Sequence, residues 1–387
     1  MSPVVLELLD ELNAAGPSQL MDTVLAALVR RTAVTAVRLL IADLEETRLE
    51  TRATLCAGAV PTGEPIPLSA TPHGEVYDSG VIQAFDAPEP TVIAPVSARK
   101  VREGVLETRL SRPATPDEVA VIGSVAVLMG YLINAADRWT DTFHITRRTR
   151  PMSLAAEIQW GSLPLSSFSS PDVSLAGALE PAYDVGGDAF DYACGTEVLF
   201  AGIFDAMGHG LRAARLSALA MAVYRNARRA GDDLDAQGAA LQDALTGSFE
   251  REGYVTGTLV KIDLGSPGHS SITRAGHPAP LLQRGSAEPE LMSIEGAMPF
   301  GIPFENPLRS EPLALASGDR LVLYSDGVTE ARPANGGAFG LSMLVPALRE
   351  ARDAPPREAA RRVIRRVRAH RAQELADDAT LLLIDIP

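Results

Sequence analysis

The feature that most constrains the fold is a turn formed by Gly186, Gly187 and Asp188 between two apolar runs. The first run covers 173–179, and the second, 198–204, leads directly into Asp205. Glycine lets the main chain turn sharply and lets another group approach closely. The pattern predicts neighbouring strand-like segments that bring two carboxylates together. Because carboxylates, carbonyls and water are the ligands that hard divalent cations prefer, it indicates half of a two-metal site.

Further acidic residues occupy the same local position later in the chain. Asp326 follows the apolar run 320–324 and precedes a glycine, and Asp377 and Asp378 stand just before the apolar run 379–386. A single aspartate at the end of a strand is often only a turn or capping residue. Several of them beside small residues predict a shared site, because converging carboxylates destabilise a fold unless cations occupy the site.

Composition limits the class of protein. A chain of 387 residues is too long for one ordinary core, so two domains are expected. The formal net charge of −14 argues against a general grip on nucleic acid or on anionic membranes, and it suits divalent cations. Cys56 and Cys194 are too few for a disulfide framework or a thiolate zinc site.

The hydropathy pattern favours a cytoplasmic protein. The first residues lack a basic segment followed by an apolar core, so no signal peptide is expected. The longest uncharged apolar run, 119–133, is shorter than a membrane span requires.

The first third of the chain mixes helical and strand patterns. Leucines and valines at helical spacing predict a helix over 4–33. Strand patterns follow at four places, 37–42, 48–55, 91–96 and 101–108. The stretch 61–90 between them is rich in proline and glycine and reads as turns.

A capping box predicts the start of a long exit helix. Thr115 can cap it, Pro116 occupies its first position, and Glu118 completes the box. The helix is expected to be apolar to residue 133 and amphipathic to about residue 148. The order of helix, strand pair, loops, strand pair and exit helix resembles a GAF-type sensor domain over 1–135, and a PAS-like sensor is the alternative.

A helical linker is predicted over 136–165. It ends in a short helical stretch, 152–163, that carries an apolar stripe. Helices of this kind often pair with a copy of themselves, so we expect a homodimer through this region.

After the linker the chain is arranged in blocks. Strands are predicted at 256–264, 270–275, 279–283, 290–294, 320–324 and 379–386, and helices at 211–229, 234–250, 341–351 and 356–374. Blocks of strands and helices indicate an α+β layered fold rather than a doubly wound parallel sheet. The arginines between 361 and 371 are expected to form the solvated face of an amphipathic helix and not a nucleic-acid patch.

Five motifs in this half together resemble the PPM metal-dependent serine/threonine protein phosphatases, in the bacterial sporulation-phosphatase (SpoIIE) branch. They are 178–188, 205–214, 275–280, 324–330 and 377–380, in the order that the family has them. The resemblance covers roughly 168–387, and 156–159 is similar to the linker of sigma-factor-regulating members. It implies an αββα sandwich over 166–387, two antiparallel sheets flanked by helices.

The resemblance also implies a site with two Mn²⁺ or Mg²⁺ ions. Asp205 would bridge the ions and the carbonyl of Ala206 would be a further ligand. Asp326 and Asp377 would complete one ion, and Asp188 would support the other directly or through water. These four aspartates are the expected catalytic residues. The ions would activate a water that attacks the phosphate, without a covalent enzyme intermediate.

The implied activity is hydrolysis of phosphoserine or phosphothreonine on a regulatory protein of the anti-anti-sigma type, under control of the N-terminal sensor. Two alternatives remain open at this point. One is a catalytically weak module that binds a signal and sequesters a partner. The other is a metal-dependent hydrolase of small phosphoesters.

The chain departs from the family pattern in its second motif. Ala206 stands where glycine is frequent, and Met207 stands where eukaryotic relatives have a histidine. His209 comes two residues later and either stabilises the loop or transfers a proton. His277, in a Gly-His-Pro turn, is interpreted as structural. No arginine at the start of the catalytic domain is placed to grip phosphate as in those relatives.

Overall fold

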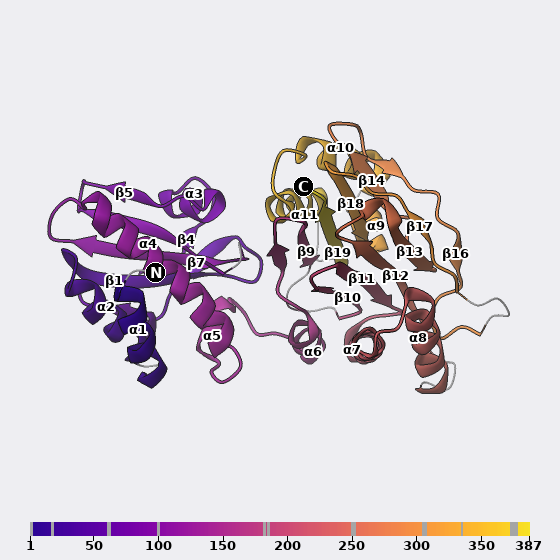
Figure 1. Cartoon of the computed structure of the whole chain (residues 1–387), viewed down its shortest axis with the longest axis horizontal. Helices are drawn as coiled ribbons and strands as arrows, with labels where there is room; N and C mark the ends of the chain where they lie inside the picture. The colour runs from indigo at the N-terminus through magenta and orange to yellow at the C-terminus, as the bar shows by residue number, and fades with distance from the viewer. Residues whose placement is uncertain are drawn as a thin grey trace. The chain divides into compact units, whose positions relative to one another are not determined.

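The structure is a computed structural model that describes residues 3–16, 19–59, 63–98, 101–180, 183, 186–248, 253–303, 308–333, 336–371 and 378–387. The chain divides into two compact units, Met1–Pro151 and Met152–Pro387 (Figure 1). The segment predicted as a linker, 136–165, is shared between them: its first part belongs to unit 1, and the helix after Pro151 belongs to unit 2.

Unit 1 is built on one antiparallel sheet. Its strand order is β4-β2-β1-β7-β6-β5, and β3 also pairs with β1. The strands are β1 (Val34–Ala42), β2 (Arg48–Glu50), β3 (Cys56–Ala57), β4 (Ile66–Pro67), β5 (Gln83–Phe85), β6 (Thr91–Ala98) and β7 (Val101–Leu110). The strand patterns read from the sequence at β1, β6 and β7 are therefore confirmed.

Helices cover both faces of this sheet because its strands alternate apolar side chains toward two cores. Leu39 and Ile41 face a core built with α1 (Pro3–Ala14), α2 (Leu20–Val29) and α4 (Pro116–Ala136). Leu40, between them, faces a second core under α3 (Pro72–Ser79). A 3-10 turn, η2 (Ala53–Leu55), and α5 (Thr142–Arg147) complete the unit.

Three expectations for unit 1 are wrong. The helix predicted over 4–33 is two helices, α1 and α2. The first ends at Ala14, shortly before Gly16 and a proline in the sequence, and proline lacks the amide hydrogen that a helix interior needs. The strand over 48–55 stops at Glu50. The region 61–90 is not only turns, since it contains α3, which begins at a Thr71 cap and ends at Gly80 in a left-handed conformation.

The exit helix α4 begins as predicted and ends early. Thr115 Oγ1 accepts from the Glu118 amide at 3.3 Å, and Glu118 Oε2 accepts from the Thr115 amide at 2.8 Å. The helix stops at Ala136 and does not reach residue 148. By length and composition alone this one helix could cross a membrane, with a mean hydropathy of 2.0. Core helices share this length and hydropathy, and Ile122, Met129 and other side chains of α4 are buried in the core.

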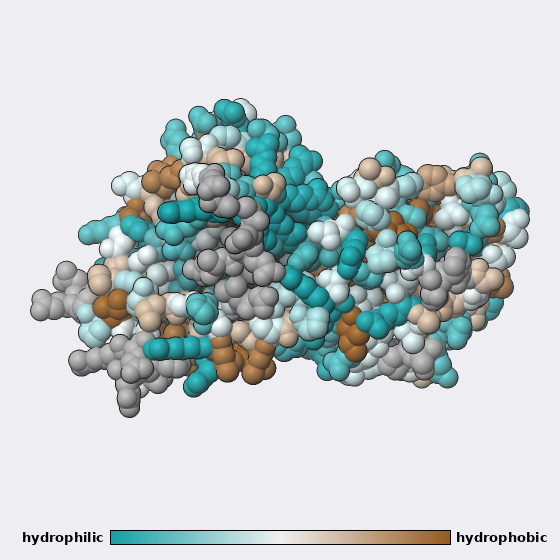
Figure 2. Space-filling view, turned by 180° about the vertical axis from the view of Figure 1, so that it is seen from behind, coloured by the Kyte–Doolittle hydropathy of each residue, from teal (hydrophilic) through white to brown (hydrophobic). Residues whose placement is uncertain are grey.

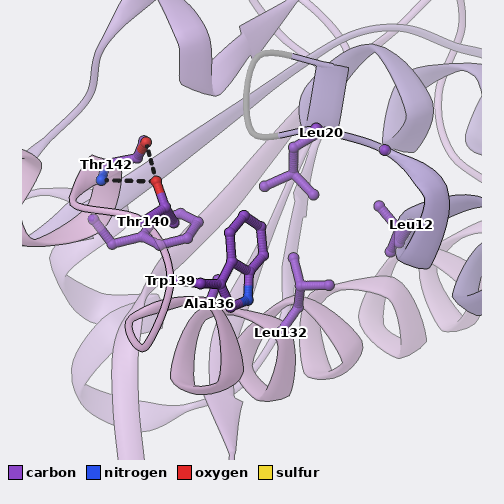
Figure 3. Close-up of a pocket in the computed structure, with 10 residues that line it drawn as sticks. Leu12, Leu20, Leu132, Ala136, Trp139, Thr140 and Thr142 are labelled. Atoms are coloured by element: carbon purple, nitrogen blue, oxygen red, sulfur yellow. Dashed lines mark hydrogen bonds between the residues drawn. The ribbon is translucent and has the colours of Figure 1, made fainter.

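A small hollow lies at the end of α4 (Figure 3). Trp139 lies near Leu20 and Leu132, and Thr140 Oγ1 lies 2.9 Å from Thr142 Oγ1 beside them. Its volume of about 20 Å³ gives room for little more than one water molecule. The hollow is therefore too small for a metabolite-sized ligand.

A buried charge cluster fastens α3 to the sheet of unit 1. Arg38 Nη2 on β1 and His73 Nε2 on α3 each lie 2.6 Å from Glu107 Oε2 on β7. Burial alone would raise the pKa of Glu107. The hydrogen bonds and charges of His73 and Arg38 outweigh it and lower the pKa to about 2. The carboxylate therefore stabilises the folded unit above its ordinary pKa of 4.5, and this contribution is lost as the pH falls from there toward 2.

We expect Glu107→Gln to lower the free energy of unfolding of unit 1 by about 3 kcal/mol at neutral pH, following the size of the pKa shift. The difference from the wild type should shrink as the pH is lowered through the window of the shift. Urea unfolding at a series of pH values measures it. A deficit that stays constant down to the lowest pH at which both proteins fold would contradict the role of the ionised carboxylate.

Unit 2 is a sandwich of two six-stranded sheets. One has the order β10-β11-β12-β13-β16 with β17 beside β13, and the other has the order β15-β14-β18-β19-β9-β8. All pairings are antiparallel except that of β13 with β16. The strands are β8 (Ser167–Ser169), β9 (Ser174–Glu180), β10 (Asp188–Cys194), β11 (Val198–Ala206), β12 (Val255–Asp263), β13 (Ser270–Ala275), β14 (Leu281–Arg284), β15 (Glu290–Leu291), β16 (Gly296–Ala297), β17 (Glu311–Leu313), β18 (Asp319–Tyr324) and β19 (Ala379–Asp385).

Three apolar cores give unit 2 its layers. The middle core joins the two sheets through side chains such as Ile203 and Leu382. Outside it, α7 (Gly210–Ala230) and α8 (Leu234–Ser248) cover the sheet of β11, and α9 (Asp326–Glu330), α10 (Gly340–Glu350) and α11 (Pro356–His370) cover the sheet of β18 (Figure 1). The αββα sandwich is thus confirmed. The remaining elements are α6 (Leu154–Ser162) and a 3-10 turn, η3 (Pro267–His269).

Polar side chains dominate the surface that Figure 2 presents, and apolar ones form small groups. The arginine-rich helix α11 follows this division. Val363, Ile364 and Val367 are buried against the sheet, while Arg362 and Arg366 are exposed. The helix is therefore amphipathic as predicted, but not all of its arginines form a solvated face: Arg361 is buried, and Arg368 and the following Arg371 pair with the buried Glu180.

Candidate metal centre

The first two predicted ligands lie side by side. Asp188 is the first residue of β10, and Asp205, near the end of β11, is its direct partner in the antiparallel ladder. Cross-strand partners project from the same face of a sheet, so the two carboxylates share one environment. Asp188 is only 1% exposed. Burial, and then the negative charges of Asp205 and Asp378, raise the pKa of Asp188 well above its usual range.

A serine from the other sheet holds Asp188. Ser325, which follows β18, donates its hydroxyl to Asp188 Oδ2 at 2.6 Å. The same hydroxyl accepts from the Thr380 amide at 2.9 Å, and Thr380 lies in β19. The ends of β10, β18 and β19 therefore meet at one edge of the sandwich.

Asp378 holds the Gly-Gly-Asp turn. Its Oδ2 accepts from the amides of Gly187 at 2.8 Å and Asp188 at 3.1 Å. The same oxygen accepts from Gln159 Nε2 at 2.7 Å. Asp378 is fully buried. This residue therefore fixes the main chain that presents Asp188, while its neighbour Asp377, the predicted ligand, lies outside the described residues.

Asp326 stands next to the start of β19 because of the glycine that follows it. A Cβ at Gly327 would lie 1.9 Å from the Asp378 carbonyl oxygen, so no other residue fits without moving the backbone. Asp326 is the first residue of α9 and is half-buried. The close approach of the two backbones places it at the same edge as Asp188.

The Ala206 loop closes the site on the side of β11. The Ala206 amide donates to the Gly187 carbonyl at 3.1 Å, and the Met207 amide donates to the Tyr254 carbonyl at 3.0 Å. Ala206 is buried. His209 is exposed and stands just before α7, where its side chain makes no capping hydrogen bond.

His277 is a neutral buried group beside the strand that pairs with β11. Its Nδ1 lies 2.8 Å from Thr256 Oγ1, and Thr256 is the ladder partner of Asp205. Burial, together with the charge of Arg274, lowers the pKa of His277 to about 3. A histidine that remains neutral at physiological pH and supports the strand beside Asp205 agrees with its interpretation as structural.

The donor set fits a hard divalent cation in its chemistry. Asp188, Asp205 and Asp326 offer carboxylate oxygens and Ala206 a carbonyl oxygen, the ligands that Mg²⁺ and Mn²⁺ prefer. Among the residues that the structure describes, no three acidic, histidine or cysteine side chains already converge on one point. Asp377, the remaining predicted ligand, is not among the described residues.

Two side chains that organise this edge were not predicted from the sequence. Ser325 was visible as part of a motif, but nothing local indicated that it would bind Asp188. Gln159 was visible only as part of the linker resemblance. The roles of both depend on partners more than a hundred residues away.

Comparison with known proteins relates the chain to one family and one fold. A sequence model of the family Stage II sporulation protein E (SpoIIE) matches residues 196–387. The structure is similar to the SiaA-PP2C domain of Pseudomonas aeruginosa, with a TM-score of 0.51 and 20% identity over 68% of this chain and 100% of that chain. This likeness confirms the predicted α+β fold of unit 2. No curated protein sequence matches the chain.

Two further solved structures are more distant in fold. The RsbU and RsbW domains of a Mycobacterium tuberculosis protein have a TM-score of 0.49 and 24% identity, over 56% of this chain and 60% of that chain. The phosphatase domain of SpoIIE from Bacillus subtilis, with a fragment of its regulatory domain, has a TM-score of 0.47 and 23% identity, over 55% and 62%. The chain thus spans less than two thirds of both.

Proposed function

We propose that this chain hydrolyses phosphoserine or phosphothreonine on a regulatory protein, because the sequence model of the SpoIIE family matches residues 196–387. The observation that carries the proposal is the pairing of Asp188 with Asp205 at one edge of the sandwich. Asp188 is buried and Asp205 is half-buried, and two like charges held side by side in this way destabilise a fold unless a cation offsets them. A bound divalent cation would therefore stabilise this edge, whereas the end of an ordinary strand gains nothing from one.

The proposed ligands have distinct roles. Asp205 would bridge the two ions, and the Ala206 carbonyl would be a further ligand. Asp326 and Asp377 would complete one ion, and Asp188 would support the other directly or through water. Two Mn²⁺ or Mg²⁺ ions, when bound, would supply an activated water and offset the charge of the phosphate. Ser325 keeps the Asp188 carboxylate oriented through its 2.6 Å hydrogen bond.

We also propose that unit 1 is a GAF-like sensor that controls the phosphatase in the cytoplasm. The supporting observation is the antiparallel order β2-β1-β7-β6-β5 with helices on both faces. The substrate is proposed to be a phosphorylated partner of the anti-anti-sigma type, as the resemblance implies. Glu107→Gln alters the stability of the proposed sensor. If this variant left phosphate release unchanged under every condition, the result would count against control of the phosphatase by unit 1.

A homodimer through the region 136–165 is proposed as well. Four large apolar side chains of that region are exposed: Trp139 at 61%, Ile145 at 46%, Leu154 at 64% and Leu165 at 48%. Apolar side chains of this size gain stability when a second copy covers them. Light scattering of the full chain tests the proposal, and a monomeric mass at micromolar concentration would contradict it.

Metal-dependent turnover of a phosphoprotein tests the proposed activity. The full chain should release phosphate from a phosphoserine-containing regulatory protein with Mn²⁺, and a chelator should abolish the release. A phosphopeptide and p-nitrophenyl phosphate, measured side by side, separate a protein phosphatase from a small-phosphoester hydrolase. A protein that binds Mn²⁺ and releases phosphate from none of these substrates would sink the proposal and leave a sequestering module.

A further inference from the structure

Helix α6 is held in unit 2 at both ends, and it contacts the Gly-Gly-Asp turn of the candidate metal centre through its first half and its middle. At its start the Ser153 amide donates to the Tyr183 carbonyl at 2.9 Å, just before the Gly-Gly-Asp turn. At its end the Ser162 carbonyl accepts from Arg225 Nη2 of α7 at 2.7 Å. Between them Ala155 packs against Gly186, where an added Cβ would lie 3.0 Å from the alanine side chain.

The contact in the middle of α6 reaches the site itself. Gln159 is 3% exposed, and its Nε2 donates to the Asp188 carbonyl at 2.8 Å and to Asp378 Oδ2 at 2.7 Å. A side-chain amide has two donor hydrogens, so both are used. The glutamine thus bridges the two segments that carry Asp188 and Asp378, which lie 190 residues apart in the chain.

Loss of this bridge would act on the Asp188 carboxylate through the backbone. Asp378 Oδ2 gathers three donors, Gln159 Nε2 and the amides of Gly187 and Asp188. Without the glutamine the buried Asp378 carboxylate would lose a strong partner, and the Asp188 carbonyl would be left buried without this donor. The turn that positions Asp188 would then be held by the hydrogen bonds from the Gly187 and Asp188 amides to Asp378, without the contact from α6.

We propose that Gln159 is a positioning residue of the metal centre, and that α6 belongs to the centre through it. This inference rests on the proposed function only in assuming a divalent cation at the Asp188–Asp205 edge. Gln159 acts by fixing the Asp378 carboxylate and the Asp188 backbone, and it touches neither metal nor substrate. Groups that orient metal ligands in this way typically change metal affinity by about 10–100-fold when they are removed.

The test replaces the glutamine with a side chain of similar length that cannot donate. Gln159→Met is expected to weaken Mn²⁺ binding, measured by calorimetry, by about tenfold or more. The matched control is Gln237→Met in α8, because Gln237 is equally buried and its Nε2 donates to the Asp232 carbonyl at 2.7 Å, away from the centre. Both variants should melt at lower temperature without metal, and only Gln159→Met should lose Mn²⁺ affinity. Wild-type affinity in a folded Gln159→Met protein would overturn the inference.

A measurement on the wild-type protein covers the case in which the variant does not fold. If Gln159 couples α6 to the centre, Mn²⁺ binding should slow amide hydrogen exchange in α6, because coupling between two sites is reciprocal. Bound Mn²⁺ without any change in α6 would overturn the inference. Neither readout needs turnover, so a protein that binds Mn²⁺ but hydrolyses no phosphoprotein would refute the proposed activity alone. A wild-type protein that binds no Mn²⁺ would overturn both.

Discussion

Asp205→Asn is expected to lower kcat/KM for phosphate release by on the order of 10³-fold or more, because it removes the proposed shared ligand of both ions. The folded protein without metal should keep or gain stability. Asp205 faces Asp188 across the ladder, and its charge, after burial, is the largest cause of the raised pKa of Asp188. Asparagine keeps the shape and removes the repulsion. Phosphate release with Mn²⁺ and urea unfolding without metal measure the two effects.

Asp191→Asn is the matched control for Asp205→Asn, which is expected to lose activity but to keep or gain stability. Asp191 lies on the same strand, β10, and is as buried as Asp188. It is surrounded by positive charge, since it accepts from Arg225 at 2.8 and 3.1 Å and from Arg228 at 2.9 Å. Its variant should lose stability, because it breaks a buried ion pair. A loss of stability in Asp205→Asn as large as that in Asp191→Asn would contradict the like-charge interpretation of the metal centre.

Asp385→Ala is expected to destabilise unit 2 by about 3–5 kcal/mol, the usual cost of leaving a buried charge without its partner. Arg320 is fully buried, and its Nε and Nη2 donate to the two carboxylate oxygens of Asp385 at 2.7 Å each. Two further donors of Arg320 reach the carbonyls of Ala351 at 3.1 Å and Ala354 at 2.8 Å. Urea unfolding of the full chain, followed by a probe in unit 2, measures the change.

Two comparison variants show whether the cost comes from the orphaned charge. The double variant Arg320→Met with Asp385→Leu should be more stable than Asp385→Ala alone, because it removes both charges and refills the space. Arg366→Met removes a surface ion pair between Arg366, whose side chain is 45% exposed, and Glu350, whose side chain is 55% exposed. It should change the stability by no more than about 1 kcal/mol. Equal losses in Asp385→Ala and Arg366→Met would refute the argument.

Local patterns in the sequence were enough to place most of unit 2. An apolar run bounded by turn residues predicts a strand wherever it occurs, and the runs before Asp205 and Asp326 are β11 and β18. Capping chemistry is equally local, which is why the start of α4 was predicted and observed. Where a local pattern ran on past a break, as over 4–33, the sequence overestimated the length of the helix.

The sequence by itself determined that aspartates stand at the ends of apolar strands, since that depends only on neighbouring residues. It could not determine which of them face each other, because that depends on strand order and register between distant segments. Only the tertiary structure pairs Asp188 with Asp205, directs the Asp378 carboxylate to the Gly187 amide, and brings Gln159 of α6 against both segments. The physical reason is that burial between two stacked sheets makes each polar group depend on a partner, and those partners come from strands and helices far apart in the chain.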